Sequence, residues 1–301
     1  MTNPSRLIVR SSARRLAATA VLALGLSVVA PVVSPATAAA PSFTPTNLGD
    51  TYLYGGCRPY ILVGMRGSGE PLQNTQYGLG DDLYLLWDGL NTSGTKFRDR
   101  ISAAVPTATA YPAVPVPISS DRTRMLILMD SYLQQVYNSS GTALMLSMVQ
   151  VANRCPNSKL ILAGYSQGAY SINYAMRRSG STTLSKVAGT VLLADPAQSP
   201  RGALRVLKSY CATGVRPAGM TTAAWNELRT VSYSSSVCVR TRAATIYTAP
   251  SSYSFRYVTA GDAVADFAAM TQLWNGYLKH INYDSTYFVR DAVRWAQTGT
   301  K

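Results

Sequence analysis

A serine flanked by two glycines is the feature of this chain best suited to chemistry: residues 164–168 read GYSQG. The spacing G-x-S-x-G is typical of a nucleophile elbow, a sharp turn that presents a serine hydroxyl at the end of a strand. The flanking residues agree, because Leu160–Ala163 predicts a buried strand and Ala169–Arg178 predicts a helix. We therefore predict that Ser166 is a catalytic nucleophile. An ordinary Gly-rich turn between a strand and a helix is the alternative.

A serine nucleophile requires a base that accepts its proton and an acid that orients the base. The chain contains one histidine, His280, which follows the serine in the sequence. We predict that His280 lies in the loop between the last two helices and acts as the base. A structural or merely exposed histidine is the alternative.

The acid has several candidates. Asp195 follows the strand after the nucleophile strand, and Asp262 follows the next predicted strand. Asp266 and Asp284 are weaker candidates. Each also has a structural explanation: Asp262 and Asp284 could cap helices, and Asp195 could form a hydrogen bond within a turn before Pro196. Position along the chain favours Asp262.

The reaction also needs hydrogen-bond donors for the oxyanion that forms when the serine attacks a carbonyl. The backbone N–H of Gln167 is one predicted donor. The second is expected in the loop after an earlier strand, which Arg66–Gly69 would form. Ser68 offers both an N–H and a hydroxyl there.

Strands and helices alternate along the chain, which predicts a mostly parallel sheet covered by helices on both faces. The predicted strands are Tyr60–Met65, Ala108–Tyr111 at an edge, Leu160–Ala163, Val187–Ala194 and Ala243–Tyr247. The predicted helices are Asp81–Leu90, a helix capped by Ser120 or Asp121, Thr142–Arg154, Ala169–Arg178, Asp262–Leu278 and Ser285–Gln297. Residues 39–56 are expected to be irregular. The predicted fold class is therefore α/β, with three α/β/α layers.

The first 38 residues have the three parts of a secretory signal peptide. Arginines precede the apolar stretch Leu16–Val33, and small residues provide a cleavage position after Ala38. An uncleaved membrane anchor is the alternative, although Pro31 and Pro35 interrupt the stretch. Residues 39–301 are then predicted to be one exported domain with a substantial core.

The net charge of +14 falls to +10 when the four arginines of residues 1–38 are removed. Such a balance favours association with anionic surfaces, for example acidic wall polymers or phospholipid headgroups. The basic residues are scattered and lack aromatic stacking platforms, so we predict no nucleic-acid partner. We expect a monomer.

Four cysteines in an exported chain predict two disulfides, with three possible pairings. Cys57 and Cys155 each precede a predicted strand, which favours their pairing and leaves Cys211 with Cys238. The chain has no C-x-x-C spacing and a single histidine. We therefore expect neither a cysteine–histidine zinc site nor any other cofactor.

Several of these motifs together resemble the cutinase family of serine esterases, in its secreted actinobacterial type. The matching segments are Cys57 before a strand that ends in Arg66–Glu70, Cys155-Pro156, the elbow, Ala194-Asp195-Pro196 and the closing His280–Tyr283. The resemblance implies an α/β-hydrolase fold with Ser166 as nucleophile and His280 as base. It also implies an oxyanion hole formed by Ser68 and Gln167, and it supports the disulfide between Cys57 and Cys155.

The sequence departs from the family pattern at the acid. The family acid usually lies in a small disulfide loop, Cys-x-x-Gly-Asp-x-Val-Cys, but Val258 and Ala265 stand where the cysteines would be. We therefore expect Asp262 to be held by packing alone, unless Cys211–Cys238 is a displaced form of that bridge.

The sequence thus predicts a secreted, cutinase-like carboxylic ester hydrolase that works through an acyl-enzyme. Its substrates would be short- or medium-chain acyl esters, lipids or polyesters. An acetyl-polysaccharide esterase on the same fold is one alternative. A non-catalytic module that binds the cell envelope is another.

Overall fold

The computed structural model describes residues 44–73, 76–92, 94–115, 139–197, 202–216, 221–223, 225–226, 249–260, 262–266, 273–281, 283 and 285–300. The predicted signal peptide, the helix capped by Ser120 or Asp121 and the strand Ala243–Tyr247 lie outside these residues.

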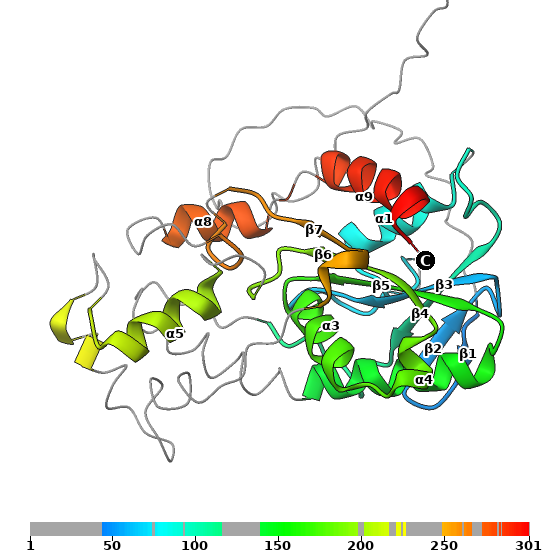
Figure 1. The fold of residues 1–301 in the computed structure, drawn as a ribbon, viewed down its shortest axis with the longest axis horizontal. Coiled ribbons are helices and arrows are strands. Elements are labelled where there is room, and N and C mark those ends of the chain that lie inside the picture. The colour runs from blue at the N-terminus through cyan, green and yellow to red at the C-terminus, as the bar shows by residue number, and fades with distance from the viewer. Residues whose placement is uncertain are drawn as a thin grey trace, which may run out of the picture. The chain divides into compact units, whose positions relative to one another are not determined.

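Seven strands of the described residues form one sheet in the order β1-β2-β4-β3-β5-β6-β7 (Figure 1). The strands from β4 to β7 in this order pair in parallel, whereas β1 and β2 are antiparallel additions. Their bounds are β1 Thr46–Asn47, β2 Thr51–Tyr54, β3 Tyr60–Met65, β4 Ile101–Pro106, β5 Lys159–Tyr165, β6 Val187–Leu193 and β7 Ser254–Tyr257. The expected α/β class with a mostly parallel sheet is confirmed.

Helices cover both faces of this sheet, as expected for three layers. α1 (Asp81–Leu90) and α9 (Ser285–Gly299) lie on one face (Figure 1). α3 (Gln167–Arg178) and the helix of residues 139–154 pack on the other. The carboxyl ends of the parallel strands therefore meet at one edge between the two layers, where α/β folds place their ligand sites.

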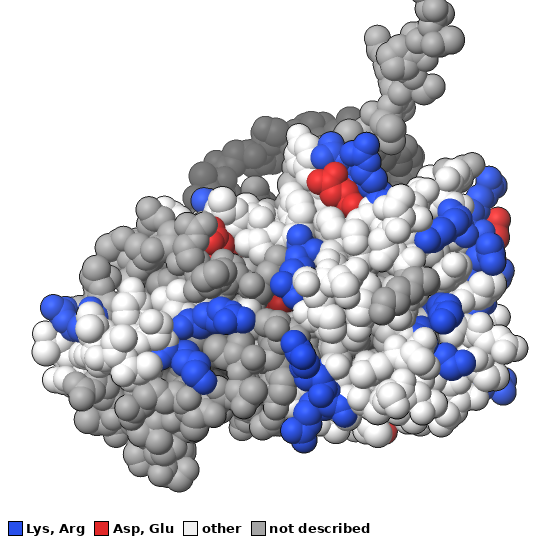
Figure 2. Space-filling model, in the orientation of Figure 1, with Lys and Arg blue, Asp and Glu red and all other residues white. Residues whose placement is uncertain are grey.

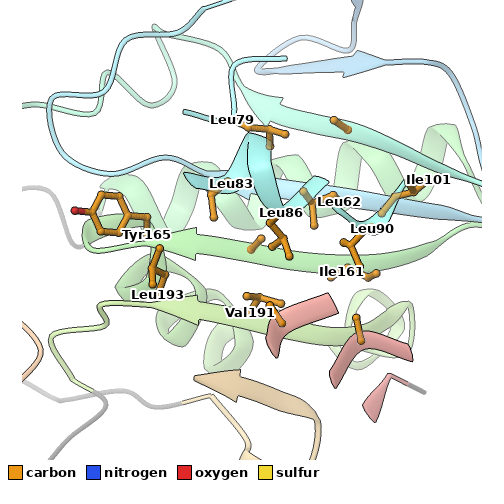
Figure 3. Packing of buried hydrophobic residues seen from close by; sticks show 14 of the residues in the cluster. Leu62, Leu79, Leu83, Leu86, Leu90, Ile101, Ile161, Tyr165, Val191 and Leu193 are labelled. Carbon is orange, nitrogen blue, oxygen red and sulfur yellow. The ribbon is translucent and has the colours of Figure 1, made fainter. Parts of the chain in front are cut away.

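The apolar side chains of α1 form one stripe that faces the sheet. Leu83, Leu86 and Leu90 are fully buried and belong to the same cluster as Leu62 of β3 and Ile161 of β5 (Figure 3). Their spacing of three and four residues places them on one side of the helix. Fully burying one such leucine contributes about 1.5–3 kcal/mol, so the scaffold beneath the strand ends is rigidly packed.

Four strands lie where the sequence predicted none. β1 and β2 fall in the segment 39–56 that we expected to be irregular, β7 follows β6 in the sheet, and β4 is the fourth. The predicted edge strand Ala108–Tyr111 is wrong, because residues 108–110 form a turn and the strand is β4. β4 lies inside the sheet and its small residues Ser102, Ala103 and Ala104 are all buried. A strand buried on both faces shows no alternation of apolar and polar residues.

The remaining helices are α4 (Ser181–Leu184), α5 (Ala203–Thr213), the short 3-10 helix η2 (Ser251–Tyr253) and α8 (Leu273–Ile281). The predicted helix Asp262–Leu278 is wrong at its start, since residues 263–265 form a turn. No helix in the described ranges is both long and apolar enough to cross a bilayer.

A disulfide joins Cys57 to Cys155 with a Cα–Cα distance of 5.4 Å. The two cysteines lie just before β3 and β5, so the bond ties together the starts of neighbouring strands. This confirms one predicted pairing. The other, Cys211–Cys238, includes Cys238, which lies outside the described residues.

Candidate active site

Ser166 occupies a sharp turn between β5 and α3. Its backbone has φ 53° and ψ −112°, a left-handed conformation that is strained for a residue with a side chain. The neighbouring glycines make the turn possible. A Cβ on Gly168 would lie 1.8 Å from the carbonyl oxygen of Met65, and one on Gly164 would lie 2.5 Å from backbone atoms of Gly168. The turn has the geometry that the pentapeptide predicts.

The structure brings Ser166, His280 and Asp262 into one chain of hydrogen bonds. His280 Nε2 lies 2.8 Å from Ser166 Oγ, and His280 Nδ1 lies 3.0 Å from both carboxylate oxygens of Asp262. All three residues are buried. When Nδ1–H donates to the carboxylate, Nε2 is left to accept the hydroxyl proton of the serine. The arrangement can therefore generate a nucleophilic serine oxygen.

His280 lies in the last turn of α8, so the prediction that it lies in the loop between the last two helices is wrong. The helix continues through Lys279 and His280, whose side chains suit the negative end of a helix dipole. Two tyrosines orient the imidazole: Tyr165 stacks on it at 5.5 Å between ring centres, and Tyr283 meets it edge-on at 6.3 Å. The Tyr165 hydroxyl also donates to the His280 carbonyl. Because Tyr165 directly precedes Ser166 in the chain, this hydrogen bond links the backbone of the base to the segment that carries the nucleophile.

Hydrogen bonds, and not packing alone, hold Asp262. Its Oδ1 accepts the backbone N–H groups of Val264 and Ala265 at 2.6 and 3.0 Å, and its Oδ2 accepts the Tyr283 hydroxyl. Burial opposes ionisation of this carboxyl, but the charge of His280 and these hydrogen bonds outweigh it. The pKa of Asp262 therefore lies below its usual value. We expected packing alone to hold Asp262, because the sequence lacks the cysteines of the family's small disulfide loop. The backbone N–H groups of this turn hold the carboxylate instead.

Asp195 lies in a different set of contacts. Its Oδ2 accepts the side-chain amide of Asn173 at 2.7 Å, and its Oδ1 accepts the backbone N–H of Ala197 at 2.9 Å. Burial raises the pKa of Asp195. Asp266 follows in the turn of Asp262, and Asp284 lies outside the described residues. Among the residues that are described, no group of three or more His, Cys, Asp or Glu side chains could hold a metal ion.

The loop after β3 brings Ser68 beside the elbow. The Ser68 hydroxyl donates to the side-chain oxygen of Gln167 at 2.9 Å. Gln167 is the first residue of α3, so its backbone N–H lies at the positive end of the helix dipole. The two residues predicted to bind the oxyanion are therefore neighbours in the structure.

Arg66, which is buried, and Glu70, which is half-buried, shape this loop, and sequence reasoning assigned no role to either. The Arg66 guanidinium donates to the carbonyl oxygens of Glu70 and Tyr111 at 2.8 and 2.6 Å. The Glu70 carboxylate accepts the backbone N–H of Gly67. Burial raises the pKa of Glu70 to about 7. Both residues belong to the Arg66–Glu70 motif, which was the signal that could have revealed them.

Comparison with known proteins gives one family. The family model described as Cutinase matches residues 88–298. A cutinase of Coprinopsis cinerea is 27% identical over 161 residues, which cover 52% of this chain and 69% of that protein. A probable cutinase of Aspergillus fumigatus is 35% identical over 94 residues, or 29% of this chain and 43% of that protein. These relatives are fungal, so they do not support the actinobacterial type.

The solved structures that this chain matches include two proteins of Trichoderma reesei. One is the catalytic core domain of an acetyl xylan esterase, which is 16% identical with a TM-score of 0.46. The match covers 81% of this chain and 99% of that domain. The other is a cutinase in complex with a phosphonate inhibitor, which is 17% identical with a TM-score of 0.37. The match covers 79% of this chain and 77% of the cutinase chain.

Proposed function

Because the chain belongs to the cutinase family, we propose that it is a serine carboxylic ester hydrolase with Ser166, His280 and Asp262 as its catalytic triad. The observation that carries the proposal is the chain of hydrogen bonds from Ser166 Oγ through His280 to Asp262. The strained backbone of Ser166 supports it as well, since a structural histidine would not require its partner to adopt a left-handed conformation.

In the proposed reaction, Ser166 Oγ attacks the ester carbonyl carbon while His280 Nε2 accepts the hydroxyl proton. Ionised Asp262 stabilises the imidazolium that results. Collapse of the tetrahedral intermediate breaks the bond to the alcohol, and His280 returns the proton to the leaving oxygen. A water molecule then attacks the acyl-enzyme by the same route, which releases the carboxylic acid and restores the serine.

We assign the backbone N–H groups of Ser68 and Gln167 to the oxyanion that forms in each tetrahedral intermediate. Donors that are already in place cost no reorganisation during the reaction, and losing one lowers the rate by about 10²–10³. The hydrogen bond between the two side chains supports this assignment, since it holds the loop after β3 against the elbow before substrate arrives.

We propose short- and medium-chain acyl esters, lipids or polyesters as substrates, with acetyl groups on polysaccharides as the alternative. The name of the family supports the former. On sequence features alone, we also propose that residues 1–38 direct export and that the mature monomer acts outside the cell, at an anionic envelope surface.

Hydrolysis of p-nitrophenyl esters from acetate to palmitate tests the proposal. Ser166→Ala should lower kcat by several powers of ten. Ser179→Ala is a matched control at the other end of α3, and its hydroxyl makes no hydrogen bond within the described part of the chain. Activity restricted to acetate would favour the polysaccharide deacetylase. Equal inertness of the wild-type protein and the Ser166 variant on every ester would favour the binding module.

A further inference from the structure

A pocket lies at the edge of the sheet where the parallel strands start, opposite the elbow. Its volume is about 180 Å³, and its wall is formed by the end of β2, the start of β4 and the C-terminal turn of α1. Tyr60 pairs with Ile101 at this edge, whereas Met65 pairs with Gly164 next to the elbow. Tyr60 and Met65 are five residues apart along β3, or about 17 Å. The pocket is therefore separate from the triad.

Aromatic rings and polar groups share the wall of this pocket. The rings of Trp87 and Tyr77 meet edge-on with centres 4.7 Å apart, and Tyr54 meets Tyr77 at 5.5 Å. Exposed Arg58 and Asp99 also line the pocket, and the Arg58 guanidinium donates to the Asp99 carbonyl. Apolar rings beside a few hydrogen-bonding groups suit a ligand with apolar faces and polar edges. A sugar ring has this character.

Two polar groups of the wall, the Ser102 hydroxyl and the Nε1 of Trp87, have no hydrogen-bond partner among the residues that the structure describes. Ser102 is 2% exposed. Buried polar groups without partners are unusual in native proteins, and these two occur in the wall of the same pocket.

Basic residues stand at the starts of four strands at this edge: Arg58 precedes β3, Arg100 precedes β4, Lys159 begins β5 and Lys186 precedes β6. Figure 2 shows basic side chains around the positions that α4 and β3 occupy in Figure 1, with few acidic ones. Helix C-termini lie at this same edge, since the helix of residues 139–154 ends before β5 and α4 ends before β6, and a helix dipole favours cations there. The edge is therefore a basic surface.

A disulfide and two hydrogen bonds hold this basic edge in a fixed shape. The disulfide joins the residues next to Arg58 and Arg154, and the Ser158 hydroxyl donates to the Arg58 carbonyl at 2.6 Å. The backbone N–H of Leu160 donates to the Lys186 carbonyl at 2.8 Å. Binding to a preorganised surface costs little ordering entropy.

We infer that the strand-start edge is a binding site for an acidic polysaccharide. One sugar ring would pack in the pocket against Trp87 and Tyr77, and carboxylates of neighbouring sugars would contact Arg58, Arg100 and Lys159. A guanidinium can bind a carboxylate through two parallel hydrogen bonds. The large apolar side chains that the described residues expose do not lie at these strand starts, so the edge suits a polymer better than a bilayer. Anchored here, the protein would direct Ser166 away from the anchoring polymer.

Calorimetric titration of the mature protein with polygalacturonate tests this inference without relying on the proposed hydrolysis. Binding should weaken as salt rises, and Arg58→Glu with Arg100→Glu should weaken it at least about tenfold. The control pair Arg290→Glu with Arg294→Glu makes the same charge change on exposed positions of α9 and should change the affinity less than about twofold.

The pocket has its own measurement. Oligogalacturonate should shift the tryptophan fluorescence of the wild-type protein, and Trp87→Phe, which keeps an aromatic ring, should remove most of that shift. Hydrolysis of a soluble acetate ester should be unaffected by the polymer and by both double variants.

Four results would overturn the inference. Equal affinity for neutral dextran would exclude an acidic partner, and equal affinity for polyacrylate would show that no sugar is recognised. An equal loss of binding in the α9 pair would mean that net charge alone is responsible. Preference for vesicles that contain phosphatidylglycerol would identify a lipid surface instead.

Discussion

Replacing Glu70 by glutamine should stabilise the protein relative to the wild type as the pH rises above about 5. The Glu70 carboxylate lies in the loop that carries Ser68 and accepts the backbone N–H of Gly67. Its burial raises its pKa from 4.5 to about 7. The glutamine amide keeps an oxygen that can accept the same N–H, but it does not titrate.

The sign follows from proton binding in the two states. In the unfolded chain Glu70 ionises near pH 4.5, whereas in the folded protein it keeps its proton until about pH 7. Unfolding therefore releases a proton between these values, and the stability present below pH 4.5 is lost as the pH rises to 7. The difference between the two pKa values corresponds to about 3 kcal/mol.

Urea unfolding of both proteins at a series of pH values from 4 to 8 measures this effect. The free energy of unfolding of the Glu70→Gln variant, relative to the wild type, should rise by about 3 kcal/mol across the series. A relative stability that does not change with pH would refute the reasoning, because Glu70 would then ionise alike in the folded and unfolded states. A change of the opposite sign would mean that Glu70 is stabilised as the anion.

Three further predictions concern the site and its scaffold. Tyr283→Phe removes a hydrogen bond to Asp262 and should lower kcat/KM about tenfold; unchanged kinetics would show that the backbone donors suffice. Ser68→Ala keeps the backbone N–H but frees the loop, so kcat should fall about tenfold while the melting temperature stays within a few degrees. Cys57→Ala with Cys155→Ala opens a loop of 98 residues and should lower the free energy of unfolding by about 4–5 kcal/mol, measured in guanidinium chloride. A smaller loss would mean that the unfolded chain is already compact.

The fold was predictable where composition is distinctive over a few residues. β3 matches its predicted range Tyr60–Met65, and α1 matches Asp81–Leu90, because one is an unbroken apolar run and the other has one apolar stripe. β4 was missed because its serine and alanines resemble a loop when taken alone. They suit a strand only because neighbouring strands and both helix layers leave room for small side chains there.

At the site, the chain itself determined the elbow, the single histidine and the cysteines whose pairing the structure confirms, since these depend on residue type and local spacing. Tertiary structure decided what depends on distant segments. It brought Asp262 to His280 and gave Asp195 other partners, although both aspartates follow strands. It also raised the pKa of Glu70, because desolvation depends on every segment that packs around a group and not on the neighbours of that group in the sequence.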